Sequence, residues 1–73
     1  MSLVECVPNF SEGRDQSTID AIRDAIASVD GIVVLDVSSD PSHHRTVVTF
    51  VAPVDKAAEA AFRGIKVASE RID

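Results

Sequence analysis

The chain has 73 residues, of which 45% are hydrophobic and 26% are charged, and its formal net charge at pH 7 is −5. A chain of this length buries only about 60% of the surface that its unfolded form exposes, so it forms one small domain or part of one. The acidic balance disfavours a general nucleic-acid-binding protein, whose surface is basic.

The first predicted element is a strand over Leu3–Val7, and apolar residues on both of its faces are typical of a central strand. Pro8 is predicted to end this strand, because proline has no N–H to donate to a ladder of hydrogen bonds. A polar loop over 7–14 follows, and such a loop after a strand is a common position for small-molecule binding. We therefore predict that it forms half of a substrate cleft. Its candidate ligand-binding residues are Asn9, Ser11, Glu12 and Arg14.

A helix is predicted to begin near Ser17, where Ser17 and Asp20 resemble a capping box, and to end at Asp30 before Gly31. The apolar residues between these ends recur at helical spacing and form one stripe, which consists of Ile19, Ile22, Ile26 and Val29. The β-branched run Ile32–Val37 is then predicted to be the second strand.

The third predicted strand, Thr46–Ala52, lies close to the second in sequence, so the two are expected to pair as an antiparallel hairpin. The connection between them contains a second polar cluster over 40–45. Its candidate ligand-binding residues are Asp40, His44 and Arg45. His43 and His44 are adjacent, and neighbouring residues of an extended chain point apart, so no metal site is predicted. An alternative interpretation is a solvated turn in which Arg45 pairs with Asp40 or Asp36.

Pro53 is predicted to end the third strand, and Asp55 is the expected N-cap of a second helix. Many of the apolar residues at helical spacing are alanines, so this helix is expected to approach a sheet closely. The predicted face consists of Ala58, Ala61, Phe62, Ile65 and Ala68, with Ile72 as an extension.

The order strand–helix–strand–strand–helix predicts an α+β fold: a ferredoxin-like β-α-β-β-α fragment with a mainly antiparallel sheet and two helices on one face. The final strand of that arrangement is missing. It would lie beside the first strand, which is therefore expected to have an open edge. Either the chain is part of a longer protein or another molecule covers that edge. The two polar clusters are expected at opposite ends of their strands unless the long connection folds back.

Cysteine content and hydropathy point to the cytoplasm. Cys6 is the only cysteine and has no internal disulfide partner, which indicates a reducing compartment. Its position within a strand favours a small buried apolar role over a nucleophilic one. No apolar run is long enough to span a membrane, and no signal-peptide pattern is present. We therefore expect a cytoplasmic protein with neither a membrane nor a nucleic-acid partner.

Residues 5–13, ECVPNFSEG, resemble the amino-terminal signature of the glutamate formimidoyltransferase family, which includes the transferase part of formimidoyltransferase-cyclodeaminase. The resemblance continues in register, with further matches at Ile19–Ile22, Leu35–Val37, Pro41–Ser42, Arg45–Val47, Thr49–Val51, Val67–Ser69 and Ile72–Asp73. It implies that residues 1–73 are an incomplete N-terminal subdomain of a transferase domain, with a folate cleft between its two subdomains.

This resemblance implies the transfer of a formimino group from N-formimino-L-glutamate to tetrahydrofolate, the co-substrate, in histidine degradation. The residues that it associates with substrate and folate binding are Asn9, Ser11, Glu12 and Arg45, together with Arg14, where other members have lysine; Asp40 and His44 are candidates from the second polar cluster. It assigns no catalytic residue to this chain, because the family's catalytic histidine lies in a Gly-Glu-His-Pro segment just after the equivalent of Asp73. His44 stands where the family often has asparagine.

Two functional interpretations follow from these observations. In the first, the chain supplies a wall of the substrate cleft, is inactive alone and has the remainder of the transferase domain as its partner. In the second, it is a non-catalytic relative or truncated binding module that self-associates, so that a homo-oligomer covers the open edge.

Overall fold

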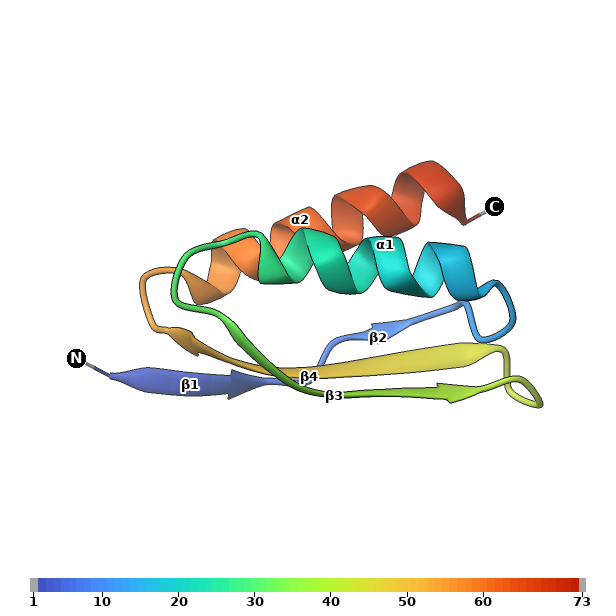
Figure 1. Cartoon of the computed structure of the whole chain (residues 1–73), viewed down its shortest axis with the longest axis horizontal. Helices are drawn as coiled ribbons and strands as arrows, with labels where there is room; N and C mark the ends of the chain where they lie inside the picture. The colour runs from blue at the N-terminus through green and yellow to red at the C-terminus, as the bar shows by residue number, and fades with distance from the viewer. Residues whose placement is uncertain (1, 73) are drawn as a thin grey trace.

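The computed structural model describes residues 2–72 and has the predicted order of elements, with two helices on one face of an antiparallel sheet (Figure 1). The elements are β1 (Leu3–Cys6), β2 (Asn9–Phe10), α1 (Gln16–Ala27), β3 (Val33–Asp40), β4 (Arg45–Pro53) and α2 (Ala57–Arg71). The predicted α+β, ferredoxin-like fragment is confirmed. Met1 and Asp73, the ends of the predicted subdomain, lie outside the described residues.

β1 and β2 are two halves of one extended strand. Both pair antiparallel with β4 in a single unbroken register. Between them, the carbonyl of Pro8 accepts a hydrogen bond from the N–H of Val48, at 3.1 Å. The prediction that Pro8 ends the strand is therefore wrong, because the proline removes one donor but its fixed φ suits an extended chain. Asn9 and Phe10 consequently belong to the sheet and not to the predicted loop.

β4 lies at the centre of the sheet, with β1 and β2 on one side and β3 on the other. Within residues 2–72, β1 and β2 pair with no other strand, so the predicted open edge is confirmed. The expectation of a central position for the first strand is wrong. Leu3 and Val7 are 63% and 50% exposed, because they lie on the face of the sheet that the helices do not cover.

β3 and β4 form the predicted antiparallel hairpin, and β3 extends past Val37 to Asp40. The register shifts between Val34 and Asp36, where Leu35 is the extra residue of a β-bulge. Leu35 is 55% exposed, whereas Val34 and Val37 pack against the core. The bulge therefore allows both valines to face the helices despite their odd spacing.

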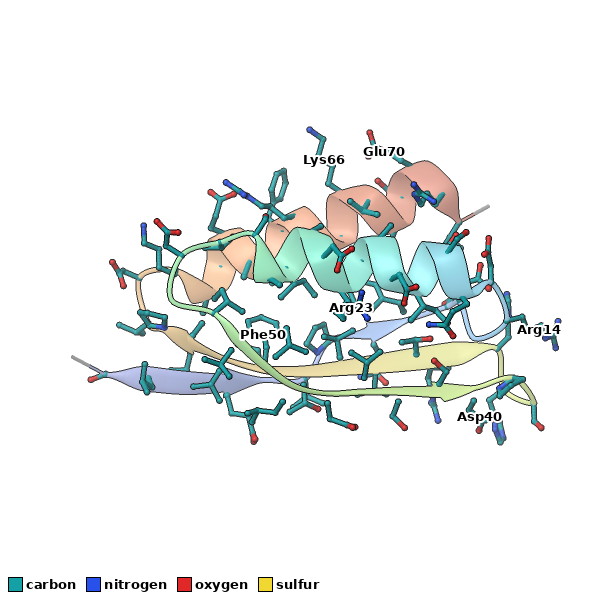
Figure 2. All side chains as sticks on the ribbon, in the orientation of Figure 1. Arg14, Arg23, Asp40, Phe50, Lys66 and Glu70 are labelled. Carbon is teal, nitrogen blue, oxygen red and sulfur yellow. The ribbon has the colours of Figure 1, made fainter. Side chains whose placement is uncertain are left out.

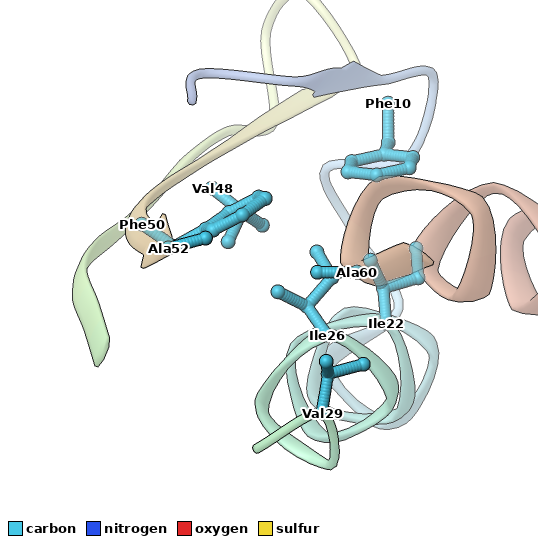
Figure 3. Close-up of a cluster of buried hydrophobic side chains, with 8 residues drawn as sticks. All are labelled: Phe10, Ile22, Ile26, Val29, Val48, Phe50, Ala52 and Ala60. Carbon is cyan, nitrogen blue, oxygen red and sulfur yellow. The ribbon is translucent and has the colours of Figure 1, made fainter. Parts of the chain in front are cut away.

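The core lies between the sheet and the helices, where apolar side chains from β2, α1, β4 and α2 meet (Figure 3). Its fully buried members include Ile22, Ile26, Val48 and Phe50, and the predicted apolar stripe of α1 is confirmed. Burial of each such side chain contributes about 1.5–3 kcal/mol to stability. Cys6 packs against this core, in agreement with the predicted apolar role.

The caps of both helices differ from the predicted ones. Asp15, and not Ser17, is the N-cap of α1, and its carboxylate accepts hydrogen bonds from the N–H and hydroxyl groups of Ser17 and Thr18. These bonds, the hydroxyl of Ser17 first, lower the pKa of Asp15. Carboxylates are favoured at this position because they satisfy free N–H groups near the positive end of the helix dipole. Lys56, and not Asp55, precedes α2.

The buried face of α2 differs from the predicted one. Ala60 and Gly64 are buried, whereas Phe62 and Ile65 are 63% and 56% exposed and Ala58 is exposed as well. The reason is the close approach of the two helices, since a Cβ on Gly64 would lie 2.9 Å from side-chain carbons of Ile26. Interiors are close-packed, so only small residues fit at this contact and the larger ones point away from it.

Candidate functional site

The two polar clusters lie at the same end of the sheet. The first is the turn over 11–15 between β2 and α1, and the second is the β3–β4 turn with its flanks, residues 40–45 (Figure 1). The expectation that they lie at opposite ends is wrong. β1–β2 and β3 all run antiparallel to β4, so the carboxyl ends of β2 and β3 lie at the same end of the sheet. We call residues 11–15 and 40–45 the hairpin end.

Gly13 allows the two turns of the hairpin end to touch through their backbones. It is buried, and a Cβ at this position would lie 2.6 Å from both the backbone nitrogen of Arg45 and the backbone oxygen of Asp40. The N–H of Gly13 donates a hydrogen bond to Nδ1 of His44, at 3.4 Å. A side chain at position 13 would therefore push the turns apart.

Thr46 fixes the first turn to the start of β4. Its hydroxyl donates a hydrogen bond to the carbonyl of Glu12 and lies 3.2 Å from the hydroxyl of Ser39. Thr46 is fully buried, so the loss of a partner would leave a costly unpaired polar group. Sequence reasoning placed Thr46 only in a strand, because a polar β-branched residue carries no sign of a partner far away in the chain.

The carboxylate of Glu12 is engaged by its own turn. It accepts hydrogen bonds from the backbone N–H groups of Asp15, at 3.0 Å, and Arg14, at 3.2 Å. These bonds hold the pKa of Glu12 below its ordinary value, although partial burial acts in the opposite direction. Nδ1 of His44 lies 3.8 Å from the same carboxylate. Because Glu12 is buried, its carboxylate shapes the turn and offers little surface to a ligand.

Asp40 organises the β3–β4 turn. Its carboxylate pairs with Nδ1 of His43, which is the main cause of its lowered pKa, and also accepts hydrogen bonds from the N–H groups of Ser42 and His43. Within residues 2–72 no ion pair joins Arg45 to a carboxylate, so the interpretation of this cluster as such a pair is wrong. His44 has a φ of 53°, a left-handed conformation that histidine and asparagine adopt more often than most residues.

Arg14 and Arg45 bring two guanidinium groups to the hairpin end. Nε of Arg14 donates a hydrogen bond to the carbonyl of Pro41, at 3.1 Å, and Figure 2 shows Arg14 and Asp40 at the same end of the molecule. Both arginines are exposed, and among residues 2–72 neither has a carboxylate oxygen within 4.0 Å. A guanidinium group can bind a carboxylate through two parallel hydrogen bonds. The hairpin end can therefore accept an anionic ligand.

Asn9 and Ser11 face a groove beside the hairpin end, to which Ser11 itself belongs. They line a groove of about 330 Å³ between β2 and the second half of α2, and its other lining residues are Phe10, Ile65, Ala68, Ser69 and Ile72. The amide nitrogen of Asn9 donates a hydrogen bond to the carbonyl of Val7, at 3.2 Å. Ser11 therefore belongs to both the groove and the hairpin end, whereas Asn9 lies in the groove alone.

Two further findings concern the described residues as a whole. Among residues 2–72, no group of three or more His, Cys, Asp and Glu side chains is placed to hold a metal ion. In the same part of the chain, no helix is both long enough and apolar enough to cross a membrane.

Comparisons with known proteins agree with the sequence signature. The family described as formiminotransferase domain, N-terminal subdomain, matches residues 3–73. The glutamate formimidoyltransferase of Thermoplasma acidophilum is 64% identical over 73 residues, which make up 100% of this chain and 24% of that relative. The glutamate formimidoyltransferase of Streptococcus pyogenes serotype M1 is 49% identical over 71 residues, 97% of this chain and 24% of the relative. The formimidoyltransferase-cyclodeaminase of Sus scrofa is 52% identical over 71 residues, 97% of this chain and 13% of the relative.

These matches cover nearly all of the chain but only 24% or 13% of the length of each relative. The matched region contains the signature over 5–13 and the whole hairpin end. The resemblance noted in the sequence is thereby confirmed. The chain belongs to the formiminotransferase family, within its N-terminal subdomain.

Proposed function

We propose that this chain forms one wall of the substrate cleft of a glutamate formimidoyltransferase. The reaction would move the formimino group of N-formimino-L-glutamate to tetrahydrofolate, as a step of histidine degradation in the cytoplasm. The observation that carries the proposal is the pair of arginines, Arg14 and Arg45, which are exposed at the hairpin end without a carboxylate partner among residues 2–72. The printed names of the relatives support the reaction.

The proposed roles follow from the contacts. Both substrates carry carboxylates, which suit the guanidinium groups of Arg14 and Arg45. Glu12 and Asp40 have their carboxylates engaged within the two turns, so we assign them to positioning the arginines. His44 accepts a hydrogen bond from the N–H of Gly13, which holds the two turns of the hairpin end together. The remaining candidates, Asn9 and Ser11, offer an amide and a hydroxyl at the edge of the cleft.

The chain is proposed to be inactive alone. Transfer of a formimino group needs a general acid or base near the reacting nitrogen and carbon, as well as groups that hold both substrates together. Neither histidine lies in the family's Gly-Glu-His-Pro segment, and His43 is already paired with Asp40. The general acid or base therefore comes from the remainder of the transferase domain, which is the proposed partner.

Activity measurements on two proteins test this proposal. One is the isolated chain, and the other is a joined protein, in which the chain replaces the matched region of the Thermoplasma acidophilum relative. The replacement is conservative, because the two sequences are 64% identical over that region. We expect formimino transfer to tetrahydrofolate by the joined protein and none by the isolated chain. Transfer by the isolated chain, or a folded but inactive joined protein, would contradict the proposal.

A second candidate function is non-catalytic self-association. The observation in its favour is the open edge of β1 and β2, together with Phe62 and Ile65, which are 63% and 56% exposed on α2. Unpaired strand edges and apolar surfaces are common contacts between copies of a protein. Sedimentation velocity over a range of concentrations distinguishes the candidates. A stable dimer without any activity of the joined protein would favour this function, and a monomer at high concentration would contradict it.

A further inference from the structure

We infer that His44 is a proton-operated switch within the hairpin end. In its neutral form the imidazole accepts a hydrogen bond from the N–H of Gly13, and in its protonated form it donates one to the carboxylate of Glu12 instead. The two turns stay joined in both forms, but through different atoms. The switch lies in the site of the proposed function, yet it rests on hydrogen bonds alone and is tested without the reaction.

One ring nitrogen of His44 faces both partners. Nδ1 lies 3.4 Å from the backbone nitrogen of Gly13 and 3.8 Å from Oε2 of Glu12. A ring nitrogen accepts a hydrogen bond only when it carries no proton, and it donates one only when it carries a proton. The contact with Gly13 therefore places the proton of neutral His44 on Nε2. Nδ1 can serve Gly13 and Glu12 only in turn, and proton binding decides between them.

Protonation favours Glu12 over Gly13. The N–H of Gly13 and a protonated Nδ1 would face each other as two donors, whereas a carboxylate accepts a charge-assisted bond that is about twice as strong as a neutral one. Such a bond spans about 2.7–2.9 Å, so the ring has to approach Glu12 by roughly 1 Å. The carboxylate has room for it. Its bonds from Arg14 and Asp15 both end on Oε2, and among residues 2–72 no group donates to Oε1.

The other charged or titratable side chains of the hairpin end are Arg14, Asp15, Asp40, His43 and Arg45. Both aspartates have their carboxylates engaged, one at the cap of α1 and the other within the β3–β4 turn. The guanidinium of Arg14 donates to the carbonyl of Pro41, and Arg45 is exposed. Within residues 2–72, Glu12 is the only carboxylate with an oxygen within 4.0 Å of a ring nitrogen of His44. Glu12 is therefore the partner that protonated His44 can reach.

The neighbouring histidine, His43, is bound in the opposite way. Its Nδ1 lies against the carboxylate of Asp40, which can only accept, so Nδ1 of His43 carries a proton in the neutral ring as well as in the charged one. Protonation of His43 therefore adds a proton at Nε2 and leaves its partner unchanged. The two adjacent histidines thus form a switch and a built-in control.

The switched contact lies one residue away from each arginine of the hairpin end. Arg14 follows Gly13, and Arg45 follows His44. A change of partner at this contact therefore shifts the backbone from which both guanidinium groups extend. The hairpin end presents its arginines in two arrangements, one for each charge state of His44, in the manner of histidine switches at other protein surfaces.

NMR of the imidazole nitrogens, on the isotope-labelled chain at about pH 8, tests the neutral form of the switch. We expect an unprotonated Nδ1 in His44, whose partner is an N–H group, and a protonated Nδ1 in His43, whose partner is a carboxylate. A protonated Nδ1 in His44 at this pH would overturn the inference, because that nitrogen could not accept a hydrogen bond from Gly13.

Amide hydrogen exchange of Gly13 between about pH 8 and about pH 5.5 tests the change of partner. Gly13 is buried, so its N–H has no ready replacement for His44. We expect its protection, corrected for the intrinsic pH dependence of exchange, to fall by about two- to tenfold in step with the protonation of His44, as for the loss of one hydrogen bond. Glu12 stays ionised over this range, because the N–H groups of Asp15 and Arg14 lower its pKa.

The N–H of Gly64, inside α2, is the internal control and should show no response. Protection of Gly13 that stays constant over this pH range would contradict the switch. The joined protein defined above is the second sample, in which we expect the same response, and its result decides if the two samples differ. Because the measurement reads a backbone hydrogen bond, it remains decisive even if the joined protein is inactive and the proposed function fails.

A matched pair of variants assigns the response to one histidine. His44→Asn keeps an acceptor oxygen but does not titrate, and asparagine also adopts the left-handed φ of 53° at this position. His43→Asn removes the titration of the neighbouring ring. We expect the protection of Gly13 to become independent of pH in His44→Asn and to keep the wild-type response in His43→Asn. The same response in both variants would overturn the role of His44. The two wild-type measurements decide the question if either variant fails to fold.

Discussion

At the scale of single residues, the hairpin end depends on a few polar contacts between segments distant in sequence. Thr46 holds the carbonyl of Glu12, and Gly13 lies directly against the backbone of the β3–β4 turn. These contacts fix the backbone from which Arg14 and Arg45 extend, because Arg14 adjoins Gly13 and Arg45 adjoins Thr46. Residues that never touch a ligand can therefore control the site.

Replacement of Thr46 tests this dependence. Thr46→Val keeps the shape of the side chain but removes the hydroxyl that binds the Glu12 carbonyl, which leaves a buried carbonyl without that donor. We expect the free energy of unfolding to fall by about 1–3 kcal/mol, measured by urea denaturation. Thr46→Ser keeps the hydroxyl and is the matched control, with a smaller loss. Equal losses in the two variants would show that the hydroxyl contributes nothing.

The lowered pKa of Glu12 predicts a loss of stability in acid. A carboxyl whose pKa is lower in the folded than in the unfolded state stabilises the fold fully above its unfolded value, near 4.5 for Glu12. This contribution disappears as the pH falls through the folded pKa. Asp15 and Asp40, whose pKa values are also lowered, act in the same direction. We therefore expect the free energy of unfolding to decrease as the pH falls below about 4.5.

The variant Glu12→Gln should make this decrease smaller, because its side chain does not titrate. Urea denaturation at a series of pH values measures the slope for the wild type and the variant. Glu70→Gln, at an exposed position of α2, is the control and should leave the slope unchanged. A Glu12→Gln curve parallel to that of the wild type would contradict the account.

At the scale of elements, the contact between α1 and α2 is set by small residues. The hydrophobic period of α1 correctly predicted its buried stripe, because large apolar residues recur along that face at Ile19, Ile22 and Ile26. The same reasoning failed for α2, where Ala60 and Gly64 form the contact and Phe62 and Ile65 point outward. The hydrophobic period identifies a contact face only when the apolar residues on that face also have a size that fits the contact. Here the short distance between the helices selected small residues over large apolar ones.

A double-mutant cycle tests the close approach at Gly64. Glycine to alanine inside a helix gains up to about 1 kcal/mol in helix propensity, but overpacking costs about 1–3 kcal/mol. The added Cβ would lie 2.9 Å from Cδ1 of Ile26, so we expect Gly64→Ala to destabilise the protein. Cγ1 of Ile26 would lie at the same 2.9 Å, so Ile26→Ala, which removes both carbons, is the background in which Gly64→Ala should cost less. Additive effects, measured by urea denaturation, would show that the two positions are not in contact.

At the scale of the whole molecule, the order of elements and the open edge could be predicted because they depend on local patterns. Periodicity, Gly31 and Pro53 delimit the elements, and the split βαβ rule then gives the sheet. The continuation of the strand past Pro8 could not be predicted from the sequence. It depends on pairing with β4 and not on the low strand propensity of proline.

The composition of the candidate site was only partly predictable. The family signature indicated which residues are candidates for the site. Their grouping depends on the direction of β4, which places both turns at one end of the sheet. The engagement of Glu12 by its own turn depends on backbone groups that carry no sequence signal. Nothing in the sequence explained the presence of His44, whereas its φ of 53° lies in a region that histidine and asparagine both adopt more often than most residues.

The central claim is that the hairpin end binds the carboxylate of a substrate through its arginines. Steady-state kinetics of formimino transfer by the joined protein test it most directly, with Arg45→Gln compared to Arg63→Gln. Arg63 pairs with Glu59 on the surface of α2, and such pairs contribute little. The loss of a hydrogen bond to a charged group costs about 1.5–3 kcal/mol, so we expect Arg45→Gln to lower kcat/KM by about 10- to 100-fold, chiefly through KM. An unchanged kcat/KM for Arg45→Gln, or an equal loss for Arg63→Gln, would contradict the claim.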